Sequence, residues 1–168
     1  MSWGSTVVVV KNKMLAAGAK NVFNRRRWIV EEPKWRKTFS ETQPLPSQDG
    51  STSAKVRCQG WFIRRRRVDY EEESCNARFS GENTWRLEGF RTFVDSDDDA
   101  NNAEVEWQNL CDSICAKLRV NTDLDQAADV FHAYPASIHL IEERMIFGVL
   151  CHWAEIHLRV REFYTQAT

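Results

Sequence analysis

Cysteine and histidine are among the residue types in this chain that could hold a metal ion. Cys111 and Cys115 are four positions apart, and Cys151 is followed directly by His152. Structural zinc sites are commonly built from paired C-x-x-C units, and the sequence contains none. We therefore predict no metal site, and we interpret Cys111 and Cys115 as small apolar side chains that pack in the core.

The sequence also lacks the patterns of covalent catalysis and of phosphate binding. It has none of the arrangements that activate a nucleophile, such as a G-x-S-x-G serine. Its seven glycines are scattered and form no Walker or dinucleotide-binding loop. We predict that the protein is not an enzyme and uses no cofactor.

The strongest local charge is a run of four arginines, Arg64, Arg65, Arg66 and Arg67. A second basic run covers residues 25–27, and an acidic run covers residues 71–73. The chain as a whole has 23 basic and 24 acidic residues, a formal net charge of -1, so any DNA contact must be local. Successive arginines of a strand point to opposite faces, where the acidic run can pair with them across a strand or a subunit boundary. Ion pairing is the favoured interpretation, and nucleic-acid contact is the alternative.

The acidic run DSDDD at residues 95–99 precedes the clearest helical pattern. It lacks the alternation and the closing glutamate of a calcium loop, whereas acceptors and negative charge stabilise the start of a helix. We therefore predict a helix that this run caps. The apolar positions that share one helical face are Trp107, Leu110, Cys111, Ile114 and Leu118. Trp107 is interpreted as a core residue.

The composition is that of a folded single domain covering residues 1–168. Hydrophobic residues make up 42% and charged residues 28% of the 168 residues. The five cysteines are an odd and scattered set, so we expect reduced thiols and a cytoplasmic site of synthesis. The apolar run at residues 7–10 is too short for a membrane span or a signal peptide. Seven tryptophans and nine phenylalanines favour self-association, since large aromatics are common in interface centres.

The remaining elements follow from local patterns. We expect a helix over residues 5–20, a β-prone segment over 22–30 that Pro33 limits, and a flexible loop over 40–53. Residues 55–70 and 78–94 predict a long projecting β-hairpin, and residues 136–143 and 145–163 predict two closing strands. In the last strand, alternate residues from Ala154 to Val160 are apolar, so one face is buried. The predicted fold is α+β, an antiparallel sheet with helices on one face.

Five stretches of this sequence resemble the tail terminator or tail completion proteins of tailed bacteriophages, which belong to the neck of the particle. The likeness covers most of residues 5–163 and leaves out the loop at 40–53. It is carried by the phrases NRRRWIVEEPKWRKTF, GWFIRRRRVDYEE, TWRLEGFRTFVDSDDD, AEVEWQNLCDSICAKLRVNTDL and ERMIFGVLCHWAEIHLRVREF.

The resemblance implies a structural role in a virion. Subunits of such proteins close into a ring, usually a hexamer, that ends growth of the tail tube and joins the tail to the head. The implied partners are further copies of the chain, the tail tube protein, the head–tail connector or stopper protein, and the genomic DNA that passes through the lumen, with no membrane. The implied location is the neck of the virion, after assembly in the bacterial cytoplasm.

For the contact between subunits we predict that the hairpin of one copy meets an acidic helix start in the next. The predicted interface residues are Trp61, Arg64, Arg65, Arg66, Arg67, Glu71 and Glu72 on the hairpin, and Asp97, Asp98 and Asp99 at the helix. Two alternatives remain open, another neck component such as a head completion or connector protein, and a nucleic-acid-binding module.

Overall fold

A computed structural model describes residues 3–25, 29–41, 57–72, 78–93, 97–119 and 130–165. Three helices and a six-stranded sheet form within these residues, so the predicted α+β class is confirmed. The elements in chain order are α1 (Trp3–Ala16), β1 (Val22–Phe23), α2 (Glu32–Phe39), β2 (Gln59–Glu72), β3 (Arg78–Thr92), α3 (Asp97–Arg119), β4 (Val130–Ala133), β5 (Ser137–Ile146) and β6 (Val149–Thr165).

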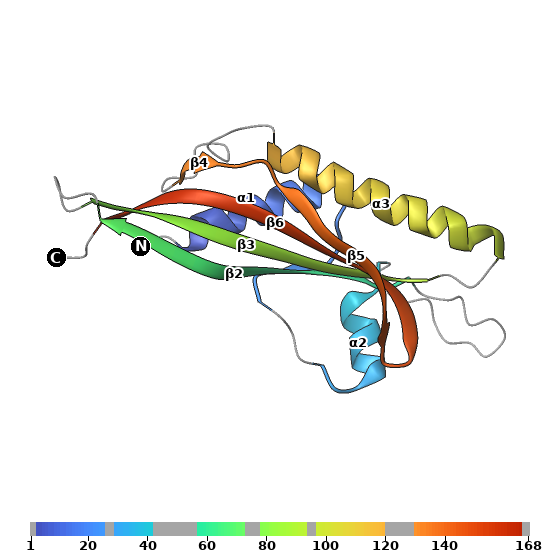
Figure 1. Ribbon diagram of the computed structural model, residues 1–168. Helices are drawn as coiled ribbons and strands as arrows, with labels where there is room; N and C mark the ends of the chain where they lie inside the picture. The colour runs from blue at the N-terminus through green and yellow to red at the C-terminus, as the bar shows by residue number, and fades with distance from the viewer. Residues whose placement is uncertain are drawn as a thin grey trace.

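Three long antiparallel strands, β2, β3 and β6, form the centre of the sheet and run the length of the molecule (Figure 1). The predicted pairing of β2 with β3 as a hairpin is confirmed, with Gln59 opposite Arg91 and Glu72 opposite Phe79. The hairpin does not project from the sheet as predicted, because β6 pairs with β3 from Arg78 to Thr92. A register shift between Arg65 and Arg67 interrupts the simple alternation expected for the arginine run. The sheet is mixed rather than purely antiparallel, because the short strand β1 runs parallel to β2.

Helices α1 and α3 cover one face of the sheet, and their apolar stripes build the main core (Figure 1). The helix predicted after the acidic run is confirmed as α3, and Trp107 is fully buried as expected. Its indole stacks on that of Trp61 from β2, with ring centroids 5.2 Å apart. Burying a large apolar side chain contributes about 1.5–3 kcal/mol, so this stacked pair is a major stabilising contact of the core.

The placement of helix α2 differs from the sequence-based prediction. Among the described residues of 22–30, which leave out 26–28, only Val22–Phe23 form a strand. Glu32–Phe39 form a helix that packs on the face opposite to α1 and α3 (Figure 1). Pro33 does not merely limit a strand: it occupies the first turn of α2, where its fixed φ and missing N–H are well tolerated. Trp35 and Phe39 are four residues apart, so both point from α2 into a second core cluster.

The closing strands are confirmed, although their turn lies further along than predicted. β5 continues to Ile146, and the turn is formed by Phe147 and Gly148, both with left-handed φ angles of 51° and 73°. Two residues with positive φ match the twist of a tight hairpin. Strand β4 was not predicted, and the predicted loop at 40–53 lies outside the described residues from position 42 onward.

Candidate functional site on the polar face of the sheet

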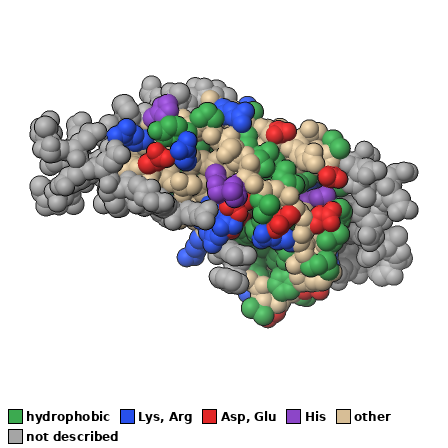
Figure 2. Space-filling model, viewed as in Figure 1, with side chains coloured by type: hydrophobic (Ala, Val, Ile, Leu, Met, Phe, Trp, Pro, Cys, Tyr) green, Lys and Arg blue, Asp and Glu red, His purple; other side chains and the backbone are tan. Residues whose placement is uncertain are grey.

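Beyond the end of α2, the central strands carry charged side chains on the same face as that helix. These residues, here called the polar face, are Arg64 of β2, Arg86 and Glu88 of β3, Glu155 and His157 of β6, and His139 of β5. The strand register explains why they meet. Arg64 lies opposite Arg86, which lies opposite His157, and Glu88 lies opposite Glu155 one row away. In Figure 2, histidine, acidic and basic side chains lie side by side near the middle of the molecule.

Two buried carboxylates are neutralised by two arginines on the polar face. Arg64 Nη2 lies 2.5 Å and Arg86 Nε lies 2.9 Å from Glu88 Oε1, and Arg86 Nη2 also pairs with Glu155 Oε2. The side chain of Glu88 is only 2% exposed, so leaving its charge unpaired would be costly. The favoured interpretation of the arginine run, ion pairing, therefore holds for Arg64, with Glu88 as its partner in place of the expected glutamates at 71–73.

Glu155 also contacts a histidine. His157 Nε2 lies 2.5 Å from Glu155 Oε1, and the ring of His139 stacks on His157 with centroids 4.3 Å apart and planes 11° apart. Burial alone would raise the pKa of Glu155, but the His157 hydrogen bond and the Arg86 charge outweigh it and hold that pKa below its ordinary value. Glu155 is thus a carboxylate that its neighbours keep charged.

The predicted interface residues fall into three groups. Trp61 is fully buried and belongs to the core, so the prediction that it lies on a contact surface is wrong. Arg64 is committed to Glu88, and Arg65 is half-buried. The structure describes only the backbone of the others, which places Arg66, Arg67, Glu71 and Glu72 in β2 and Asp97, Asp98 and Asp99 in the first turn of α3.

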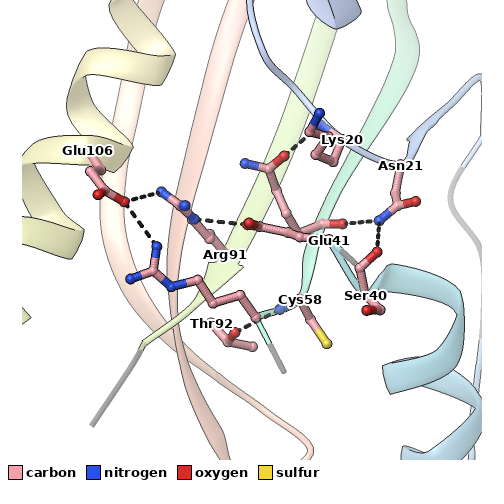
Figure 3. Close-up of polar contacts among 10 residues, drawn as sticks. Lys20, Asn21, Ser40, Glu41, Cys58, Arg91, Thr92 and Glu106 are labelled. Carbon is pink, nitrogen blue, oxygen red and sulfur yellow. Dashed lines mark hydrogen bonds and ion pairs between the residues drawn. The ribbon is translucent and has the colours of Figure 1, made fainter. Parts of the chain in front are cut away.

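A second polar network ties α3 to the sheet and to the end of α2 (Figure 3). Arg91 of β3 reaches Glu41 at 2.9 Å and Glu106 of α3 at 3.1 Å, and Arg57 reaches the same Glu106 carboxylate at 3.2 Å. Nearby, the side-chain amide of Asn21 donates to the carbonyls of Ser40 and Gln59, both at 3.0 Å. These contacts close the edge of the sheet and position no reactive group, so their role is structural.

A pocket of about 360 Å³, lined mostly by hydrophobic residues, lies between α2 and the turn of β5 and β6. Its aromatic lining includes Trp35, Phe62 and Trp153, and the guanidinium of Arg144 lies 4.4 Å from the centre of the Trp153 ring. The sequence analysis missed this pocket because α2 was not predicted. Its walls belong mostly to the second core cluster.

The described cysteines carry no sign of nucleophilic activation. All four, Cys58, Cys111, Cys115 and Cys151, are buried thiols outside any disulfide bond. Burial raises the pKa of the Cys58 thiol to about 11 and that of Cys111 to about 12. A reactive cysteine needs a lowered pKa, so these thiols act as apolar packing groups.

No protein-family model and no curated protein matches this chain. Among the described helices, none has the length and apolar character to cross a membrane.

Proposed function

We propose that this protein is a structural component of a tailed bacteriophage that forms a ring at the head-proximal end of the tail. In this role it ends growth of the tail tube and joins the tail to the head connector. The sequence phrases quoted above support the proposal, and one structural observation carries it. The two surfaces expected to meet between copies are too far apart along the sheet to contact each other within one chain.

The first surface is the outer edge of β2. Within the described residues β1 pairs with β2 only at Trp61 and Phe62, so from Arg66 to Glu72 this strand has a neighbouring strand on one side only. Seven residues of open edge extend over about 23 Å. Unpaired strand edges present free N–H and C=O groups that accept a further strand or chain.

The second surface is the start of α3, which follows β3 at the end of the strand far from the hairpin turn (Figure 1). Arg67 lies opposite Thr84, eight residues before the end of β3 at Thr92, so the arginine run and the start of α3 are about 26 Å apart along the strand. The arginine run and Asp97 therefore cannot meet within one chain. Contact between two different surfaces of the same protein is head-to-tail, and such contacts close into rings when the rotation between copies permits.

The ion pairs of the polar face limit which arginines are available for the contact between subunits. Arg64 is neutralised within its own subunit by Glu88, and half-buried Arg65 is poorly placed for another copy. Charge pairing with Asp98 and Asp99 of the next copy is accordingly assigned to Arg66 and Arg67.

A charge-swap experiment tests this contact in the purified, untagged protein. The wild type is expected to show a ring mass by native mass spectrometry. Arg66→Glu with Arg67→Glu should reduce assembly, as should Asp98→Lys with Asp99→Lys, and mixing the two variants should restore it because opposite charges again face each other.

The matched control reverses two lysines on the exposed side of α2, Lys34→Glu with Lys37→Glu, and should leave the ring intact. A wild-type protein that stays monomeric at every concentration would contradict the proposal. So would tails of ordinary length, seen by negative-stain microscopy, in a phage that lacks this protein.

The alternatives make different predictions. A head completion or connector protein would assemble on the portal instead of on the tail tube, so the position of the ring in the virion separates it from a terminator. A nucleic-acid-binding module would retain DNA with a steep dependence on salt. Arg64 and Arg86 are already paired with the buried acids Glu88 and Glu155, which leaves less free positive charge for DNA on the polar face.

A further inference from the structure

We propose that His139, Glu155 and His157 form a binding site for a transition-metal ion, with Zn²⁺ as the best fit. Each residue offers one ligand atom, and the three atoms lie within 4.8 Å of one another. Two imidazole nitrogens and one carboxylate oxygen suit zinc and its neighbours in the first transition row, whereas Ca²⁺ and Mg²⁺ prefer oxygen ligands alone.

The pairing of β5 with β6 brings these residues together. Ser137 lies opposite His157, and a register shift between Ile138 and Leu140 takes His139 out of the regular pairing. At this irregularity the ring of His139 lies against that of His157. Register irregularities often redirect a side chain at a functional site. The ligands are separated by 16 and 2 positions in the sequence, which matches no metal-binding spacing.

Two of the three ligand atoms, those of Glu155 and His157, are held in place before any ion binds. Arg86 binds Oε2 of Glu155, which fixes the carboxylate and leaves Oε1 directed at Nε2 of His157. Oε1 and Nε2 are 2.5 Å apart, so the imidazole N–H of His157 donates its proton in a hydrogen bond to the charged carboxylate. A bound ion takes the place of that proton, and the two atoms separate slightly to become adjacent ligands. Exposed His139 then needs only a side-chain rotation to supply the third ligand.

The surrounding charges predict moderate affinity. Glu88 and Glu155 are balanced by Arg64 and Arg86, so the ion enters a site without net negative charge. Three ligands leave one position of a tetrahedral zinc site for water or for a group from another molecule. Binding in the micromolar range, with one ion per chain, is the expected result.

Calorimetric titration of the metal-free, untagged protein with Zn²⁺ tests the site. The wild type should bind one equivalent, and His139→Gln should weaken binding at least tenfold. Because His139 is exposed, this variant should keep its fold, which circular dichroism can check. The matched control is His132→Gln on β4. The ring of His132 contacts Tyr134, which is not one of the three ligands, so this variant should bind Zn²⁺ with the affinity of the wild type.

Co²⁺ substitution identifies the ligand type independently. Co²⁺ bound by imidazole and carboxylate should show visible d–d bands without the near-ultraviolet band of a cobalt–thiolate bond. A thiolate band would place the ion on cysteine and overturn the proposal. Absence of saturable Zn²⁺ binding, or equal binding by wild type and His139→Gln, would overturn it as well.

Discussion

At the scale of single residues, Glu88 is the acidic group on which the ion pairs of the polar face converge. It is almost fully buried, and it contacts Arg64 of the neighbouring strand β2 and Arg86 of its own strand β3. Such a group stabilises the fold only while its partners are present, because a buried charge without them pays the full cost of leaving water.

Glu88→Gln should therefore destabilise the protein. Arg64 and Arg86 are partly exposed and can turn toward water, so we expect a loss of about 1–3 kcal/mol in the free energy of unfolding. Urea titration followed by tryptophan fluorescence measures it. The control is Glu82→Gln, which removes an exposed pair with Arg159 and should cost about 0–1 kcal/mol. Equal losses in the two variants would show that the buried ion pairs of Glu88 contribute no more to the free energy of unfolding than the exposed pair of Glu82.

His152 predicts how stability depends on pH. Burial lowers its pKa below the ordinary 6.5, an effect that Glu143 and Glu104 oppose and Arg91 supports. Below pH 6.5 the unfolded chain takes up the proton before the folded protein does, so this residue's contribution is complete above 6.5 and is lost as the pH falls toward the folded pKa.

We expect His152→Phe to flatten this part of the pH profile. The ring of His152 stacks on Phe93, a contact that phenylalanine can keep without a titrating group. Urea midpoints measured between about pH 7 and about pH 5 should fall less in the variant than in the wild type. An identical slope would assign the acid sensitivity to other groups.

At the scale of elements, two buried side chains, Trp35 and Phe39, attach α2 to the sheet. The ring of Trp35 packs against Phe90 at 5.3 Å and Phe39 at 5.8 Å, while the residues on the outer side of the helix face solvent. Trp35→Ala should cost about 3–5 kcal/mol, because it leaves a cavity beneath the helix. Lys34→Ala, one position earlier and exposed, should change stability by less than about 0.5 kcal/mol. Chemical denaturation distinguishes the two, and similar small effects would mean that α2 adds little to the fold.

At the scale of the whole molecule, the proposed ring depends on charge pairing between the open edge of β2 and the start of α3. Exposed charges are screened over about 10 Å at 0.1 M salt and over about 3 Å at 1 M. The assembled fraction should therefore fall as sodium chloride is raised across that range, as measured by light scattering coupled to size exclusion. A ring that is insensitive to salt would point to strand pairing or apolar contact as the main source of its stability.

Local patterns in the sequence predicted α3, the β2–β3 hairpin and the buried face of β6. The acidic run at 95–99 and the helical spacing from Trp107 to Leu118 are local features of the chain, so they can be recognised in the sequence without knowledge of the fold. Helix α2 was missed because only Trp35 and Phe39 mark its buried side, and because Pro33 is compatible both with the end of a strand and with the first turn of a helix.

The type of each long element, and the residues that share one of its faces, can be derived from the amino-acid pattern alone, since the periods of helices and strands are properties of the backbone. Which faces meet depends on how the elements pack together. The register of β2, β3, β5 and β6 joins Arg64 to Glu88 and His139 to His157, and the packing of α3 places Trp61 in the core. Register and packing depend on contacts between distant segments, which no single segment of the chain encodes.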